Sequence, residues 1–182
     1  DYLRDVWYKT SHLLDNEQTR IEDSLSRFKN YKKQPLKFNF PNSFNGKLKK
    51  KSYKKNIKAA VIRENGINSE REMAYMLHLT GFQVKDVHMT DLVSGRETLE
   101  DINMIVFPGG FSNSDVLGSA KGWAGAFKFN IRAKKAIEGF YKRKNTLSLG
   151  VCNGCQLMME LNLIDKKLEN NHPKMEYNNS KK

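Results

Sequence analysis

Apolar residues are unevenly spread along the chain. They concentrate between Ile57 and Ile164, whereas the first 56 residues and the last 18 are markedly more polar. The central stretch is long enough to bury one hydrophobic core. We therefore expect one folded domain with flanking segments that are poorly able to pack by themselves.

The first 35 residues are predicted to be helical. Their apolar residues recur at roughly helical intervals, without an internal glycine, until Pro35 ends the pattern. Turn residues and a lysine run then fill 36–56, which we assign as a linker with a domain boundary between about 45 and 56. The recurring apolar residues are Leu3, Val6, Trp7, Leu13, Leu14, Ile21, Leu25 and Phe28.

Residues 57–182 have the pattern of an α/β domain. Short apolar or alternating runs predict strands in 57–63, 82–89, 103–108 and 145–151, and helical patterns lie between and after them. The resulting order is strand, helix, strand, strand, helix, strand, helix. It indicates an open, mostly parallel sheet with flanking helices.

Two of the helices carry more specific predictions. Ser69 and Glu72 have the spacing of a capping box, and the helix that they begin should bury Met73, Met76 and Leu77 and end at Gly81. A basic amphipathic helix is predicted for 127–143. Its buried face should comprise Phe127, Ile131, Ala136, Ile137 and Phe140.

The last predicted strand runs directly into the sequence LGVCNGCQL, which contains both cysteines. A strand that turns at once into a helix has the geometry of a nucleophile elbow, in which a tight turn exposes one side chain. Gly150 and Gly154 flank Cys152 at minus two and plus two, where close backbone approach requires small residues. At a helix amino terminus the helix dipole favours a thiolate on Cys152, and the Asn153 N–H is oriented to stabilise an oxyanion.

Other interpretations of the two cysteines remain open at this point. A redox pair of the C-x-x-C type would also begin a helix after a strand, and two inert buried thiols are a third possibility. A structural zinc site is disfavoured, because no second pair of Cys or His lies nearby at ligand spacing, so we expect no metal.

A Pro-Gly-Gly loop follows the preceding predicted strand. Gly109 and Gly110 end that strand within the sequence VFPGGFSNSD, at the sheet edge where open α/β sheets bind substrates. Backbone amides there can face a ligand, so this loop and the cysteine elbow together predict an oxyanion hole.

These residues resemble class I glutamine amidotransferases. GVCNGCQ after a strand and PGGFS upstream are typical of that family, and the likeness from about Ile57 to Ile164 is closest to the carboxyl-terminal glutaminase domain of the large, single-chain phosphoribosylformylglycinamidine synthases. LRDVWYKTSHLLDNEQ is similar to the helical end of their synthetase region. The resemblance implies a ligase of purine biosynthesis that uses glutamine-derived ammonia and ATP to convert formylglycinamide ribonucleotide to formylglycinamidine ribonucleotide.

The resemblance also implies roles for individual residues. Cys152 would attack the glutamine carboxamide, forming a γ-glutamyl thioester and releasing ammonia, and the amides of Gly110 and Asn153 would form the oxyanion hole. Gly109, Phe111 and Gln156 match positions at the glutamine site, and Cys155 would be a packing neighbour. The chain departs from the family at Asn113-Ser114, where Tyr-Gly is common.

A thiol nucleophile needs a base, and the family uses a His-x-Glu pair. None of the four histidines, His12, His78, His88 and His172, is followed by glutamate two residues later. We therefore interpret the chain as part of a longer enzyme: the end of a synthetase region (1–35), a linker (36–56) and a partial amidotransferase domain (57–182). The synthetase region would be a partner and would hold ATP and magnesium. An open sheet edge would favour self-association.

A non-catalytic alternative is a flavodoxin-like interaction domain with inert thiols. The chain is also basic, with a net charge of +12, so the second form of this alternative is a nucleic-acid-binding module with inert thiols. The lysines, however, lie in local runs without interleaved aromatic residues, so we expect no nucleic acid as partner. No apolar run approaches 18 residues, so no membrane span is expected. Two cysteines and no signal-peptide pattern favour the cytoplasm.

Overall fold

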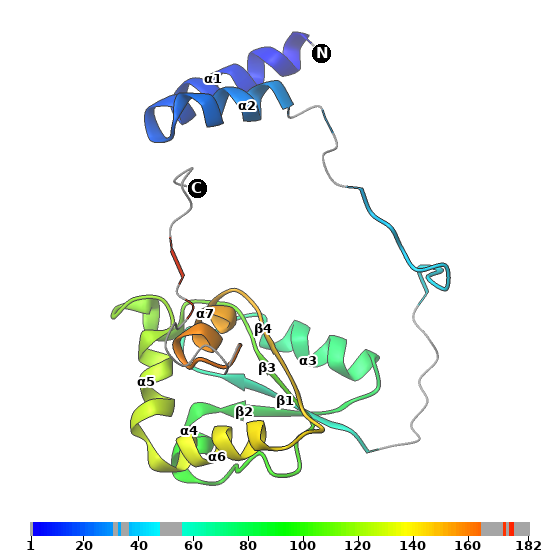
Figure 1. Ribbon diagram of the computed structural model, residues 1–182, viewed down its shortest axis with the longest axis vertical. Coiled ribbons are helices and arrows are strands. Elements are labelled where there is room, and N and C mark those ends of the chain that lie inside the picture. The colour runs from blue at the N-terminus through cyan, green and yellow to red at the C-terminus, as the bar shows by residue number, and fades with distance from the viewer. Residues whose placement is uncertain are drawn as a thin grey trace. The chain divides into compact units, whose positions relative to one another are not determined.

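The computed structural model describes residues 2–30, 33, 37–47, 56–164, 173, 175 and 176. It divides into two compact units, which are described separately (Figure 1). One contains the amino-terminal helices, and the other contains a sheet with its flanking helices.

The amino-terminal unit is a pair of helices, α1 (Tyr2–Gln18) and α2 (Ile21–Asn30). Side chains link the two: Arg27 Nη2 lies 2.5 Å from Asp15 Oδ2, and the His12 ring stacks on Phe28 at 4.9 Å between centroids. The predicted helical content is confirmed, with a break at Thr19 and Arg20. Most of the apolar side chains stay exposed, and the side chain of Trp7 is 77% accessible.

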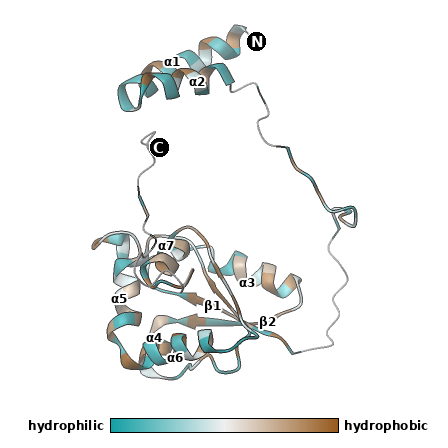
Figure 2. Ribbon diagram, viewed as in Figure 1, coloured by the Kyte–Doolittle hydropathy of each residue, from teal (hydrophilic) through white to brown (hydrophobic). Residues whose placement is uncertain are grey.

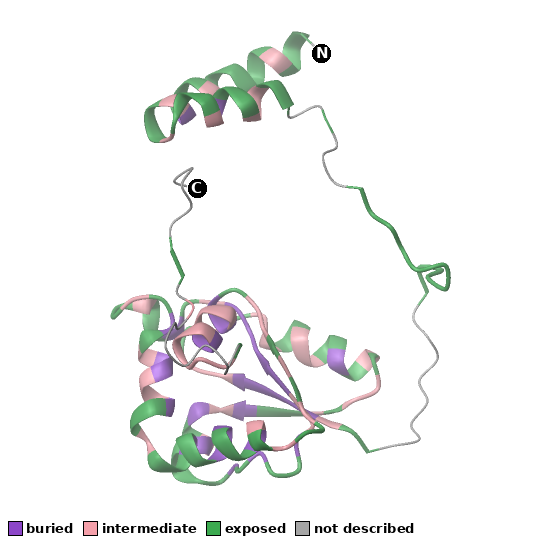
Figure 3. Cartoon of the chain, viewed as in Figure 1, coloured by how far each residue is buried: buried purple, intermediate pink, exposed green. Residues whose placement is uncertain are grey.

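The second unit contains a four-stranded parallel sheet in the order β2-β1-β3-β4. The strands are β1 (Lys58–Arg63), β2 (Gln83–His88), β3 (Met104–Phe107) and β4 (Leu147–Gly150). The predicted α/β class and the four predicted strands are confirmed. β1 and β3 are central, and both are buried, as their uninterrupted apolar sequences require (Figure 3).

The helices cover both faces of the sheet. They are α3 (Glu70–Leu79), α4 (Met89–Ser94), α5 (Lys121–Phe129), α6 (Ile131–Lys142) and α7 (Asn153–Glu160). A 3-10 turn, η1 (Ser112–Asp115), follows β3. No helix in the described ranges is both long enough and apolar enough to cross a membrane.

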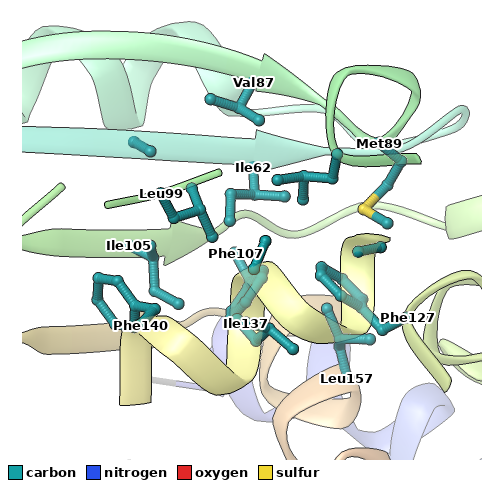
Figure 4. Close-up of a cluster of buried hydrophobic side chains, with 14 of the residues drawn as sticks. Ile62, Val87, Met89, Leu99, Ile105, Phe107, Phe127, Ile137, Phe140 and Leu157 are labelled. Carbon is teal, nitrogen blue, oxygen red and sulfur yellow. The ribbon is translucent and has the colours of Figure 1, made fainter. Parts of the chain in front are cut away.

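Alternate residues of the central strands face two separate hydrophobic clusters. Ala60 and Ile62 of β1 and Phe107 of β3 belong to the larger cluster, together with side chains of α4, α5, α6 and α7 (Figure 4). Ala59, Val61 and Val106 belong to the smaller cluster, beneath α3. Because successive side chains of a strand point to opposite faces, both faces of the central strands are buried. Figure 2 shows apolar colouring on the strands.

Some details of the predicted helices are wrong. Ser69 has a left-handed backbone (φ 68°) and its side chain makes no capping hydrogen bond, because the loop before it is bound to the backbone that follows β3. Met76 is half-exposed, whereas Leu77 is buried as predicted. The predicted helix 127–143 is two helices, because Asn130 ends α5 and its Oδ1 accepts the amides of Arg132 and Ala133 to cap α6.

Two further differences concern burial and helix count. Ile131 was expected to be buried but is 84% exposed at the start of α6, and α4 was not predicted at all. α4 begins with a capping box formed by His88 and Asp91. β4 lies at one edge of the described sheet, and its side chains Leu147 and Leu149 are exposed.

Arg143 joins the end of α6 to the turn before β3. Its guanidinium donates to the carbonyl oxygens of Leu99 (2.9 Å), Glu100 (2.7 Å) and Ile102 (2.5 Å). The same group lies 5.2 Å from the centroid of the Phe140 ring. A planar, forked donor suits this arrangement of three acceptors.

Replacing Arg143 by lysine should therefore lower the free energy of unfolding by about 2 kcal/mol, since an ammonium cannot serve three carbonyls in this geometry. Urea denaturation followed by circular dichroism measures the change. Arg96→Lys is the matched control, because Arg96 forms an exposed ion pair with Asp91 and should change stability by less than about 0.5 kcal/mol. Equal effects of the two substitutions would contradict the role of Arg143.

Candidate active site

Cys152 lies at the turn between β4 and α7 and is exposed. Its backbone angles are φ 52° and ψ −112°, a region that residues other than glycine rarely adopt. Such a conformation costs on the order of 1–3 kcal/mol and persists only where the surroundings enforce it. The structure therefore gives Cys152 the strained strand-turn-helix geometry that the sequence predicted.

The two glycines around Cys152 are required by close backbone packing, as predicted. A Cβ atom on Gly154 would lie 1.9 Å from the carbonyl oxygen of Phe107, at the end of β3. A Cβ atom on Gly150 would lie 2.7 Å from the carbonyl oxygen of Gly154 and from Met158 Sδ. The helix α7 can start this close to the sheet only because both positions lack a side chain.

The Pro-Gly-Gly loop lies directly beside the cysteine. β3 and β4 are neighbours, and an added Cβ on Gly109 would lie 3.1 Å from Cys152 Cβ and 3.8 Å from Cys152 Sγ. Gly110 has φ 138°, and a Cβ there would lie 2.7 Å from backbone atoms of residues 66–68. The sequence predicted that these two segments, about 40 residues apart in the chain, lie together, and the structure brings them together.

The loop after β1 holds the other side of the Pro-Gly-Gly loop. Asn68 N–H donates to the carbonyl of Gly109 (3.0 Å), and Phe111 N–H donates to the carbonyl of Gly66 (2.9 Å). Ile67 and Gly110 consequently form an isolated antiparallel bridge. This bridge lies where the sheet order reverses between β1 and β3, which is the usual ligand-binding edge of an open α/β sheet.

The amides of Gly110 and Asn153 have no acceptor within the described part of the chain. Free amides in the two loops beside a thiol could receive the negative charge of a tetrahedral intermediate. Their role as an oxyanion hole stays a prediction, as do the roles of Gly109, Phe111 and Gln156 at a glutamine site. Phe111 is exposed, and Gln156 Oε1 accepts a hydrogen bond from Asn153 Nδ2 (3.0 Å).

Sequence reasoning missed the side chain of Asn153, which is buried and joins the two loops. Asn153 Oδ1 accepts the amide of Ser112 (3.2 Å), and Asn153 Nδ2 donates to both carboxylate oxygens of Asp115 (3.1 Å each). Asp115 had no assigned role. The one signal in the sequence was an acidic residue in the loop beside a strand end, which by itself is common on protein surfaces.

The segment where the sequence departs from the family pattern is conformationally unusual. Asn113, Ser114 and Asp115 have φ values of 51°, 54° and 49°, so three successive residues with side chains are left-handed. The Asn113 side chain packs against α5, where a Cβ on Gly122 would lie 3.1 Å from Asn113 Nδ2. Asparagine tolerates this backbone region better than serine does.

Residues 56–182 match the family model described as "CobB/CobQ-like glutamine amidotransferase domain". The chain belongs to this glutamine amidotransferase family. The resemblance predicted from the motifs around Cys152 and Gly109 is thereby confirmed.

Longer curated proteins are similar to this amidotransferase chain over most of its length. The "Probable phosphoribosylformylglycinamidine synthase, chloroplastic/mitochondrial" of Arabidopsis thaliana is 39% identical over 98% of this chain and 13% of its own length. The "Phosphoribosylformylglycinamidine synthase" of Drosophila melanogaster is 38% identical over 87% of this chain and 12% of its own length. The chain thus spans about an eighth of the relatives that it matches.

Among solved structures, "Structure of PurLQS from Thermotoga maritima" is similar to this chain at 29% identity. The match covers 61% of this chain and 47% of that one, with a TM-score of 0.47.

The histidines of the described residues do not lie at the amidotransferase elbow. His12 is on α1, His78 is on α3, and His88 ends β2, which β1 and β3 separate from β4. The His88 ring is engaged at the start of α4, where Nδ1 accepts the amide of Thr90. His172 lies outside the described residues. Nor do the described residues contain a group of three or more His, Cys, Asp or Glu side chains placed to bind a metal.

The left-handed run predicts a stabilising substitution. Ser114→Gly should raise the free energy of unfolding by about 1 kcal/mol, because glycine adopts positive φ without steric cost. Ser119 is also exposed but has a negative φ, so Ser119→Gly should lower stability by about 0.5 kcal/mol. Thermal unfolding of both variants tests the strain, which would be absent if Ser114→Gly behaved like Ser119→Gly.

Proposed function

We propose that this chain carries the glutaminase nucleophile of a phosphoribosylformylglycinamidine synthase. The observation that supports this most strongly is the strained turn at Cys152, beside Gly109 and two amides that have no acceptor among the residues that the structure describes. The names of the longer relatives are consistent with this activity.

The proposed reaction begins with attack of the Cys152 thiolate on the carboxamide carbon of glutamine. A carbon–sulfur bond forms, and the electron pair of the carbonyl moves to the oxygen, which the amides of Gly110 and Asn153 would stabilise. Collapse of this intermediate expels the amide nitrogen, which takes up a proton and leaves as ammonia, and a γ-glutamyl thioester remains. Water then hydrolyses the thioester to glutamate and restores the thiol.

The ammonia would serve a synthetase region of the longer protein. There, with ATP and magnesium, it would replace the amide oxygen of formylglycinamide ribonucleotide and yield formylglycinamidine ribonucleotide. In this proposal α1 and α2 belong to the end of the synthetase region, and glutamine and that region are the partners of the amidotransferase domain. A cytoplasmic location and self-association through a sheet edge stay predictions.

The nucleophile can be tested directly by affinity labelling. Diazo-oxo-norleucine, a glutamine analogue with an electrophilic carbon, should alkylate Cys152 and leave Cys155 largely unmodified. Glutamine should protect, and Cys152→Ser should abolish labelling whereas Cys155→Ser should retain it. Mass spectrometry of tryptic peptides measures each modification.

Equal labelling of the two cysteines, without protection by glutamine, would overturn the proposed function. The alternatives are then a flavodoxin-like module or a basic nucleic-acid-binding module with inert thiols. Binding to DNA or RNA that weakens steeply with salt would indicate the second. No feature of the described residues or of the relatives favours either.

A polypeptide of these 182 residues should turn over glutamine at a negligible rate by itself. A thiol nucleophile of this kind needs a base to activate it and an acid to protonate the departing nitrogen, and the sequence has no His-x-Glu pair. Release of glutamate by the purified chain, compared with an intact amidotransferase, measures this. A comparable rate would show that other groups supply the proton transfers.

A further inference from the structure

The Asn153 carboxamide is the centre of a polar network that connects three segments of the chain. The residue is 1% exposed, and its side chain has hydrogen-bond partners at both ends. Its oxygen holds the loop after β3 through Ser112 N–H, and its nitrogen reaches Asp115 at the end of η1 and Gln156 on its own helix. Burial of a side-chain amide costs little free energy only while all of its hydrogen-bond partners are in place.

Asp115 extends the network to a third segment. Its Oδ1 accepts the amide of Ala120 (3.0 Å), immediately before α5, in addition to the bond from Asn153 Nδ2. One carboxylate therefore fixes the end of η1, the start of α5 and the first residue of α7. Asp115 is held in a left-handed conformation (φ 49°), so the surrounding structure, and not its local backbone preference, keeps it there.

The network determines which way the Asn153 carboxamide faces. An ionised carboxylate only accepts hydrogen bonds, so Asp115 selects the orientation with Nδ2 toward itself and Oδ1 toward Ser112 N–H. In the reverse orientation two donors would meet at Ser112, and two acceptors would meet at Asp115. Removal of the carboxylate therefore releases the constraint that keeps an acceptor opposite Ser112.

Ser112 N–H lies two residues beyond Gly110, whose amide is one of the two predicted oxyanion donors. The loop is thus held on both sides of the site: by Gly66 and Asn68 after β1, and by Asn153 at the start of α7. Asn153 in turn supplies the second donor from its own backbone. The same side chain consequently joins the residue that carries one of these amides to the loop that carries the other.

We propose that Asp115 is a positioning residue of the active site, which acts through the Asn153 carboxamide to align the backbone amides of Gly110 and Asn153 for the oxyanion. This inference rests on the proposed function. It assigns no contact between Asp115 and substrate. It predicts that the alignment of the two amides depends on the hydrogen-bonding pattern between the side chains of Asp115 and Asn153, and less on which of the two residues carries the carboxylate.

The test compares two reagents that modify the same thiolate. A chloromethyl ketone analogue of glutamine presents a carbonyl to Cys152, and addition of sulfur to the carbonyl carbon develops an oxyanion. The sulfur then displaces chloride from the adjacent carbon through a three-membered sulfonium ring, and its bond to the first carbon breaks as the oxyanion re-forms the carbonyl, which leaves a thioether. Iodoacetamide forms its thioether by direct displacement of iodide, without an oxyanion. The maximal rate with the ketone, divided by the iodoacetamide rate, therefore reports on the oxyanion hole independently of thiolate content.

Asp115→Ala should lower this ratio on the order of tenfold, because displaced donors stabilise the oxyanion poorly. The ketone concentration that gives half of the maximal rate should change little. Asn153→Asp should lower it as well, since two carboxylates would then face each other. The double variant Asp115→Asn with Asn153→Asp restores every donor opposite an acceptor, once the Gln156 amide turns, and should recover most of the ratio. All variants are measured in the full 182-residue chain.

Asp101→Ala is the matched control. This substitution also removes a carboxylate that accepts a hydrogen bond, here from Lys58 Nζ (2.5 Å), and that bond lowers the pKa of Asp101. Asp101, however, precedes β3 and lies at the opposite end of that strand from Gly109. The control should leave the ratio unchanged. Thermal unfolding of each variant identifies any that fails to fold, and the double variant then still tests the inference.

The outcomes separate the two levels of the proposal. If the unaltered protein shows no glutamine-protected preference of the ketone for Cys152, both the proposed function and this inference fail. If it does, but Asp115→Ala keeps the ratio or the double variant is no better than Asn153→Asp, only the positioning role fails. A loss in Asp115→Ala together with recovery in the double variant supports it.

Discussion

The approach of α7 to the end of β3 is the constraint on which the candidate site depends. The backbone at Gly154 lies so near the carbonyl of Phe107 that no side chain fits between them, and the chain must leave β4 and enter the helix within three residues. This brings Cys152 beside Gly109 and forces its backbone into a conformation that is otherwise avoided. Burial of Phe107, Leu157 and Met158 in the larger cluster supplies the stabilisation that offsets this strain.

The sheet could be predicted from sequence because its signals are local and mutually consistent. β1 and β3 are short apolar runs that end at turn residues. The spacing of the glycines around Cys152 indicates that the backbone of α7 closely approaches that of the strands. Even the adjacency of the two loops followed from the rule that consecutive parallel strands align their carboxyl ends. Apart from that adjacency, these features depend on residue types within a window of a few positions.

The features that could not be predicted depend on contacts between distant segments. Ser69 has the residue type and spacing of a capping residue. However, hydrogen bonds from Asn68 and Phe111 fix the preceding loop, and Ser69 has a left-handed backbone and a side chain that makes no capping hydrogen bond. Asn130 divides the segment that the sequence predicts as one amphipathic helix, because its backbone is extended and its side chain accepts the amides of Arg132 and Ala133 at the start of α6. The Asn153 network required three segments to be placed before any partner could be named.

The positive φ of Cys152 has an evolutionary consequence. Glycine would adopt this backbone conformation without the steric cost that a side chain carries, so the fold is expected to be more stable with glycine at this position. Selection for the chemistry of the thiol and selection for stability would therefore act in opposite directions at this position. In a lineage released from the first pressure, this codon is among those where drift toward glycine would meet the least resistance.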